Sequence, residues 1–205
     1  PEQCVYAISV SHPDKVYRDR TVDFFNQHIE AAVQLDCDHM VVSTGFAYLD
    51  VDAEDAFGWC AEAMGRIARK AEQEGVTLAV EPFTKYTTHI CNEASQLRRL
   101  LRTVNSPRLM GLADTDVIAT TAVDTFSTFL DVIGPENLGH VHFVDGNPGG
   151  HLVPGDGVLD LDGALEKLKA IHYTGALGLE VLDRRYVFAP EAAMKQAMDW
   201  YKERI

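Results

Sequence analysis

The sequence predicts an α/β fold in which parallel strands alternate with helices. Short apolar runs of strand length alternate with longer segments whose apolar residues recur at helical spacing. Four of these runs end at or beside Glu81, Asp114, His142 and Glu180. The intervals between these residues are 33, 28 and 38 residues, close to the roughly 30 residues of one strand and helix unit in a (β/α)8 TIM barrel. We therefore expect a barrel that brings the four side chains together at one mouth.

The first part of the chain begins with an apolar stretch at residues 4–10, which is predicted to be extended. A helix follows, because apolar side chains recur at helical spacing from Phe24 to Val33. Residues 40–43 form the next strand. The longest helix is predicted at residues 53–74 and stops at Gly75, a residue typical of helix ends.

The rest of the chain repeats this alternation. Further strands are predicted at residues 76–80, 109–113, 138–144 and 176–181, and further helices at residues 94–104, 123–133, 161–171 and 189–204. Pro82 cannot continue a central ladder, so the chain is expected to leave the sheet directly after Glu81. Asn92 is the predicted cap of the helix that follows. Strict alternation favours parallel βαβ units over a sandwich.

His140 and His142 lie two residues apart in a predicted strand, so both side chains point to the same face. The structural alternative for each acid is a helix cap or a salt bridge, and for any one acid alone this alternative is as good as a functional role. Four such residues in register weaken the alternative considerably. The arginines of the helix at residues 94–104 are interpreted as a solvated face and not as a phosphate site.

The composition limits the classes of function. The 205 residues are 46% hydrophobic with no break in composition, so residues 1–205 are predicted to form a single domain. A net charge of -13 makes nucleic acid an unfavourable partner. No apolar run has the length of a membrane span, so no membrane partner is expected. The widely spaced Cys4, Cys37, Cys60 and Cys91 suit reduced thiols in a cytoplasmic protein.

Five short runs carry a resemblance to a known family. They are EPFTKY at 81–86, NSPRLMGLAD at 105–114, GHVHFVD at 139–145, HLVPGDG at 151–157 and LEVLDRRY at 179–186. In this order they resemble the sugar-phosphate isomerase/epimerase group of xylose isomerase-like TIM barrels, and within it the fructoselysine 3-epimerase (psicoselysine epimerase) type. The resemblance places the strands of this chain at about the fourth to the eighth strand-and-helix unit of a complete barrel. The first three units are therefore expected to be absent, and the domain to be incomplete at its N-terminus.

The resemblance implies one divalent metal ion, Mn²⁺, Co²⁺ or Mg²⁺, held by Glu81, Asp114, His142 and Glu180. It also implies that Glu81 and Glu180 are the catalytic acid and base, and that His140 lies behind the ligands. The residue types agree with this assignment, because an oxygen-rich set with one imidazole suits these ions. Proton transfer at a carbon beside a carbonyl also needs an acid, a base and a group that stabilises the enediolate.

The remaining site residues are less defined. His151 and Arg185 are candidate substrate contacts, and Asp116 is interpreted as an ordinary loop acid. Three positions depart from the family pattern, at Thr87, Val117 and Pro148, and they leave the sugar undefined. The expected partner is a small-molecule sugar, and a homo-oligomer is expected.

The predicted function is 3-epimerisation of a ketose or ketosamine through an enediolate, with a fructoselysine-like substrate as the first choice. Another sugar or sugar-phosphate isomerase on the same scaffold, of the hydroxypyruvate isomerase or inosose dehydratase type, stays open. A truncated, inactive barrel that acts as a binding module also stays open. An endonuclease is disfavoured, because the sequence has no evident multi-histidine zinc cluster or basic surface.

Overall fold

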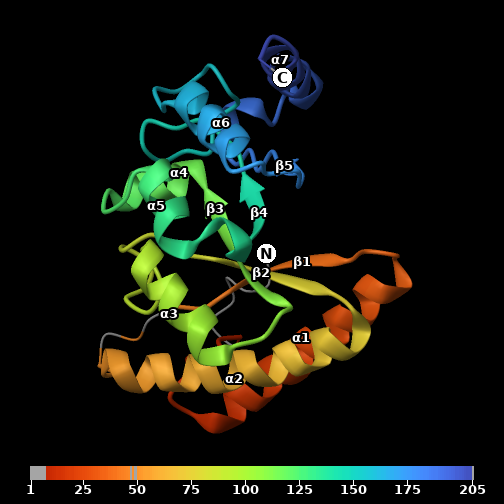
Figure 1. Ribbon diagram of the computed structural model, residues 1–205, viewed down its shortest axis with the longest axis vertical. Helices are drawn as coiled ribbons and strands as arrows, with labels where there is room; N and C mark the ends of the chain where they lie inside the picture. The colour runs from red at the N-terminus through yellow and green to blue at the C-terminus, as the bar shows by residue number, and fades with distance from the viewer. Residues whose placement is uncertain (1–7, 47, 49, 205) are drawn as a thin grey trace.

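The centre of the protein is a parallel sheet of five strands, shown in Figure 1. The computed structural model describes residues 8–46, 48 and 50–204. The strands are β1 (His39–Ser43), β2 (Thr77–Glu81), β3 (Leu109–Asp114), β4 (Leu138–His142) and β5 (Leu177–Gly178). They lie side by side in chain order, and each neighbouring pair is parallel. The five strands form a half-barrel, which agrees with the prediction of a partial (β/α)8 barrel.

Helices connect the strands and follow the sheet in the same order as the chain (Figure 1). They are α1 (Lys15–Gln34), α2 (Ala53–Glu74), α3 (Ala94–Val104), α4 (Thr115–Thr121), α5 (Phe126–Ile133), α6 (Leu161–Ala170) and α7 (Pro190–Lys202), with short 3-10 turns η2 (Pro135–Asn137) and η3 (Arg184–Tyr186). None of the described helices has the length and apolar character needed to cross a membrane.

The core lies between the strands and the inner faces of the helices. Met64 and Ile67 of α2 are fully buried, as are Leu78 and Val80 of β2. Strands buried in this way are continuous apolar runs, because helices cover a parallel sheet. α2 ends where Gly75 takes a φ of 78°, a left-handed conformation that glycine adopts without strain.

Most predicted elements are confirmed to within a few residues, and the differences are local. The prediction of Asn92 as a cap is wrong: Glu93 occupies the cap position, and the Asn92 amide donates to the Thr88 carbonyl at 2.9 Å. α4 was not predicted, and the helix expected at 123–133 begins at Phe126 as α5. The strand expected at 176–181 is reduced to β5, which is two residues long, so Glu180 lies two residues beyond the strand.

Two predictions fall partly outside the described residues. The extended stretch at 4–10 is described only from residue 8, and Cys4 is not described. Of the other cysteines, Cys60 and Cys91 are buried and Cys37 is exposed, and all three are free thiols.

Candidate metal centre

Four side chains converge at the carboxyl ends of neighbouring strands. Glu81 is the last residue of β2, Asp114 the last of β3 and His142 the last of β4, while Glu180 lies two residues beyond β5. Asp114 and His142 are partners in the β3–β4 register. Because the carboxyl ends of parallel strands meet at one edge, residues that are far apart in the sequence become neighbours here.

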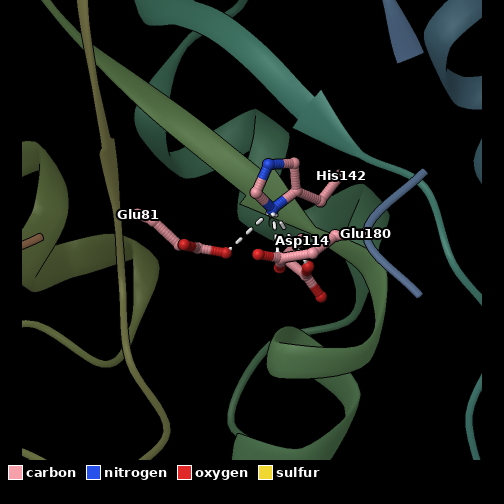
Figure 2. A group of neighbouring side chains, drawn as sticks. All are labelled: Glu81, Asp114, His142 and Glu180. Atoms are coloured by element: carbon pink, nitrogen blue, oxygen red, sulfur yellow. Dashed lines mark hydrogen bonds and ion pairs between the residues drawn. The ribbon is translucent and has the colours of Figure 1, made fainter. Parts of the chain in front are cut away.

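The four side chains point at one another around the imidazole of His142 (Figure 2). The His142 Nδ1 atom lies 3.0 Å from Glu81 Oε1, 3.2 Å from Glu180 Oε2 and 3.5 Å from Asp114 Oδ2. One ligand atom from each of the four residues lies within 4.8 Å of every other. This donor set of three carboxylates and one imidazole matches the preferences of hard or borderline divalent cations.

The charges of the cluster also fit a cation. Three carboxylates face the same ring nitrogen, and one N–H cannot donate to all three. Asp114 Oδ2 is buried and accepts no well-directed hydrogen bond from any described residue. A buried carboxylate oxygen without a partner is costly, and a divalent ion between these oxygens would remove that cost. The residues present therefore fit a metal ion.

The pKa values follow from this crowding. Burial opposes the charge on His142, but the facing carboxylates of Asp114, Glu180 and Glu81 raise its pKa to about 12. Burial alone would raise the pKa of Asp114, whereas the His142 and His151 rings hold it at about 2. For Glu81 the effect of burial is the larger one. Burial raises the pKa of Glu81, and the hydrogen bond with His142 only partly offsets the rise.

Asp114 performs two tasks with its two oxygens. Oδ1 accepts the backbone N–H groups of Asp116 and Val117, at 2.8 Å and 2.7 Å, and so caps α4. Oδ2 faces the cluster. The structural alternative considered for this acid, a helix cap, is therefore correct for one oxygen and leaves the other free to bind a ligand.

His140 packs against His142, and its predicted place behind the ligands stays a prediction. Its ring meets the His142 ring edge to face, with centroids 5.3 Å apart. Gly178 of β5 allows this packing, since a Cβ atom there would lie 2.8 Å from His140 Nε2. Burial, followed by the neighbouring His142, lowers the pKa of His140, so this ring favours the neutral form.

The two predicted substrate contacts have different surroundings. His151 reaches the cluster, with Nε2 3.4 Å from Asp114 Oδ2 and 3.6 Å from Glu180 Oε2. Arg185 is turned to Asp183, with Nε 3.2 Å from Oδ1, and makes no ion pair with the four cluster residues. Its role as a substrate contact stays a prediction.

Three polar residues near the strand ends were missed or misjudged from the sequence. The interpretation of Asp116 as an ordinary loop acid is wrong, because Asp116 is fully buried in the first turn of α4. Asp145 is also buried and accepts four backbone N–H groups. Ser43 is the register partner of Glu81, and its buried hydroxyl has no hydrogen-bond partner among the described residues. The only sequence feature that could have pointed to Ser43 was its position at the end of a predicted strand.

A half-barrel with three carboxylates and an imidazole gathered at its strand ends is the arrangement of a (β/α) barrel protein with a candidate metal site. Residues 3–204 match the model of the xylose isomerase-like TIM barrel family, and the chain belongs to this family. The chain is 26% identical over 204 residues to fructoselysine 3-epimerase of Shigella flexneri, covering 98% of this chain and 73% of that protein.

Solved structures share the fold. The D-psicose 3-epimerase of Clostridium cellulolyticum H10, determined with D-tagatose, superposes with a TM-score of 0.84 at 18% identity, over 96% of this chain and 74% of that one. The 3-keto-D-glucoside 4-epimerase of E. coli superposes with a TM-score of 0.85 at 18% identity, over 96% and 75%. These relatives are epimerases, which are isomerases, as the sequence predicts for this enzyme.

Proposed function

We propose that this protein is a divalent-metal-dependent 3-epimerase of a ketose or ketosamine, with a fructoselysine-like sugar as the first candidate. The observation that carries the proposal is the convergence of Glu81, Asp114, His142 and Glu180 from four successive strand ends. The likeness to fructoselysine 3-epimerase supports the reaction, and the oxygen-rich ligand set supports Mn²⁺, Co²⁺ or Mg²⁺. Asp114 and His142 would hold the ion from β3 and β4, with Glu81 and Glu180 completing the set.

The ion, when bound, would supply a positive charge that stabilises the negative oxygen of the enediolate. The chain supplies the proton transfer. Glu81 comes from β2 and Glu180 from the chain after β5, so the two carboxylates flank β3 and β4 from opposite sides. A sugar carbon between them would present one face to each carboxylate.

The proposed reaction breaks the C3–H bond of the sugar. One carboxylate removes the proton, and the electron pair moves into the enediolate. The other glutamate, in its protonated form, then returns a proton to the opposite face of C3. One glutamate gains a proton and the other loses one, so solvent exchange must restore the pair before the next turnover in the same direction.

The test is transfer of solvent deuterium to a ketose or to fructoselysine in D₂O, with the protein loaded separately with Mn²⁺, Co²⁺ or Mg²⁺. We expect the 3-epimer with one deuterium at C3, and no product after chelation. Deuterium at C1 would instead indicate aldose–ketose isomerisation on the same scaffold. Failure to bind a stoichiometric metal ion, together with the absence of any exchange, would favour the binding-module alternative.

A second reaction deserves the same assay, because the structural neighbour from E. coli acts as a 4-epimerase on a 3-keto sugar. Proton exchange beside a C3 carbonyl would place deuterium at C4. Sampling both kinds of sugar therefore separates the two epimerisations by the position of the label.

A further inference from the structure

His151 is held in an unusual backbone conformation beside the cluster. Its φ is 48°, in the left-handed region that residues other than glycine rarely adopt, and it follows Gly149 and Gly150 with φ values of 96° and 110°. Strain of this kind persists only where the surrounding structure enforces it, and it concentrates at functional sites. The strained loop brings the ring to Asp114 and Glu180, which it faces through Nε2.

The carboxylate of Asp116 contacts both the backbone and the ring of His151. Its Oδ1 atom accepts the backbone N–H of Gly149 at 2.5 Å, and its Oδ2 atom accepts the backbone N–H of His151 at 3.0 Å. The same Oδ2 lies 2.9 Å from the His151 ring nitrogen Nδ1. One carboxylate therefore fixes the backbone and the ring of the same residue.

The loop is shaped to admit this carboxylate. A Cβ atom at Gly146 would lie 1.9 Å from Asp116 Oδ1, so any side chain there would displace the acid. Asp116 is fully buried, and its only ionic contact among the described residues is with His151. A buried carboxylate is costly unless its hydrogen bonds are made, and here all of them go to the segment that carries His151.

We propose that Asp116 is a positioning residue that holds His151 with Nε2 aimed at the ligand cluster, where Nε2 contacts an oxygen of the sugar beside the metal. This inference rests on the proposed function. Because Asp116 occupies the Nδ1 side of the ring, the ring offers its opposite nitrogen to the sugar. A carboxylate that orients a histidine ring fixes which nitrogen faces the reacting group.

The alternative, that Asp116 only stabilises the loop, has a matched comparison in Asp145. Asp145 is also buried, and its four acceptor contacts go to backbone N–H groups of Gly146, Gly155, Gly157 and Leu159. It makes no ion pair with a histidine in the described residues. Loss of Asp145 should therefore loosen the loop without removing a contact to the His151 ring, whereas loss of Asp116 removes that contact directly.

The test is a double-mutant cycle on Asp116→Asn and His151→Gln in the metal-loaded enzyme. Each single change should lower kcat about 10- to 100-fold, with a smaller change in KM, a loss typical of residues that orient a functional group. In the His151→Gln background, Asp116→Asn should cost little more, because residues that act as one unit are not additive. Metal affinity, measured by calorimetry, should change less than kcat in both variants.

A spectroscopic arm does not depend on activity. Long-range ¹H–¹⁵N spectra of histidine-labelled protein, free and loaded with Mg²⁺, should show the His151 Nδ1 signal moved more by Asp116→Asn, which removes a contact to the ring, than by Asp145→Asn, which removes contacts to the loop backbone. Unmoved signals in Asp116→Asn would overturn the inference. So would additive losses in an active enzyme, which would leave the proposed function intact. Wild-type enzyme without exchange at any sugar carbon would instead overturn the proposed function.

Discussion

Glu81 and Glu180 differ in how far solvent reaches them, although both face His142. The Glu81 side chain is 12% exposed and the Glu180 side chain 39% exposed. Burial raises the pKa of Glu81, which favours its protonated form more than that of an exposed glutamate. In the proposed reaction the two carboxylates have opposite tasks at any moment, and this difference in environment suits a pair that shares one proton.

Replacing either carboxylate with its amide should remove proton transfer at C3. We expect Glu81→Gln and Glu180→Gln to lower the rate of deuterium exchange about 10²- to 10⁴-fold, the usual contribution of a positioned acid or base. Glu166→Gln is the matched control, because Glu166 is exposed and pairs only with Lys169 in the described structure. Full exchange in either cluster variant would contradict the assigned roles.

Tyr201 offers a pH prediction away from the cluster. Its hydroxyl donates to the Phe143 carbonyl at 3.0 Å, and burial raises its pKa from 10.0 to about 12. Between pH 10 and 12 the unfolded chain loses this proton while the folded protein keeps it, so ionisation favours unfolding and stability falls as the pH rises. In Tyr201→Phe, the free energy of unfolding should fall less steeply over this window, whereas the exposed Tyr86→Phe should retain the wild-type slope.

At the scale of elements, Asp145 organises the segment between β4 and α6. Its Oδ1 atom accepts from Gly146 and Leu159 and its Oδ2 atom from Gly155 and Gly157, at 2.9 to 3.0 Å. In Asp145→Asn one oxygen becomes an NH₂ group that faces two N–H donors. The expected loss in free energy of unfolding is roughly 2–4 kcal/mol, measured by urea denaturation, since each unsatisfied buried donor costs about 1–3 kcal/mol.

Asp131→Asn is the control for this change. Asp131 is an exposed carboxylate that pairs with Lys167, and ion pairs at the surface contribute at most about 1 kcal/mol. A loss from Asp145→Asn no larger than that of the control would show that the segment holds its shape without the carboxylate.

The sequence predicted the elements that follow simple periodic patterns. β2, β3 and β4 were predicted because a strand covered by helices is a continuous apolar run. α2 was predicted because its apolar residues recur at helical spacing up to Gly75, which ends the helix. α4 was missed because a seven-residue helix is too short to show a period, and its cap, Asp114, was already assigned to the strand end. β5 was overestimated because its ladder with β4 ends at Gly178.

At the scale of the whole molecule, sequence patterns could predict the residues at the strand ends but not the contacts around them. Glu81, Asp114, His142 and Glu180 could be proposed from the sequence because every parallel strand ends at one edge. The contact between Asp116 and His151 depends on three glycines and on positive φ angles in a loop, which no periodic pattern records. Sequence reasoning therefore proposed the four residues at the strand ends and named His151, but it missed the buried contact between Asp116 and His151.

Because the four candidate ligands come from β2, β3, β4 and the chain after β5, an ion bound by them would join most of the sheet. An ion that binds only the folded state stabilises it by mass action, by about 2.7 kcal/mol at 100 times its Kd. For a chain of this size that corresponds to a rise in Tm of roughly 5–10 °C. Calorimetric scans with Mn²⁺ should show the rise and lose it on adding a chelator. Glu180→Ala should reduce it and Glu166→Gln should not, so an equal rise in both variants would place the ion elsewhere on the protein.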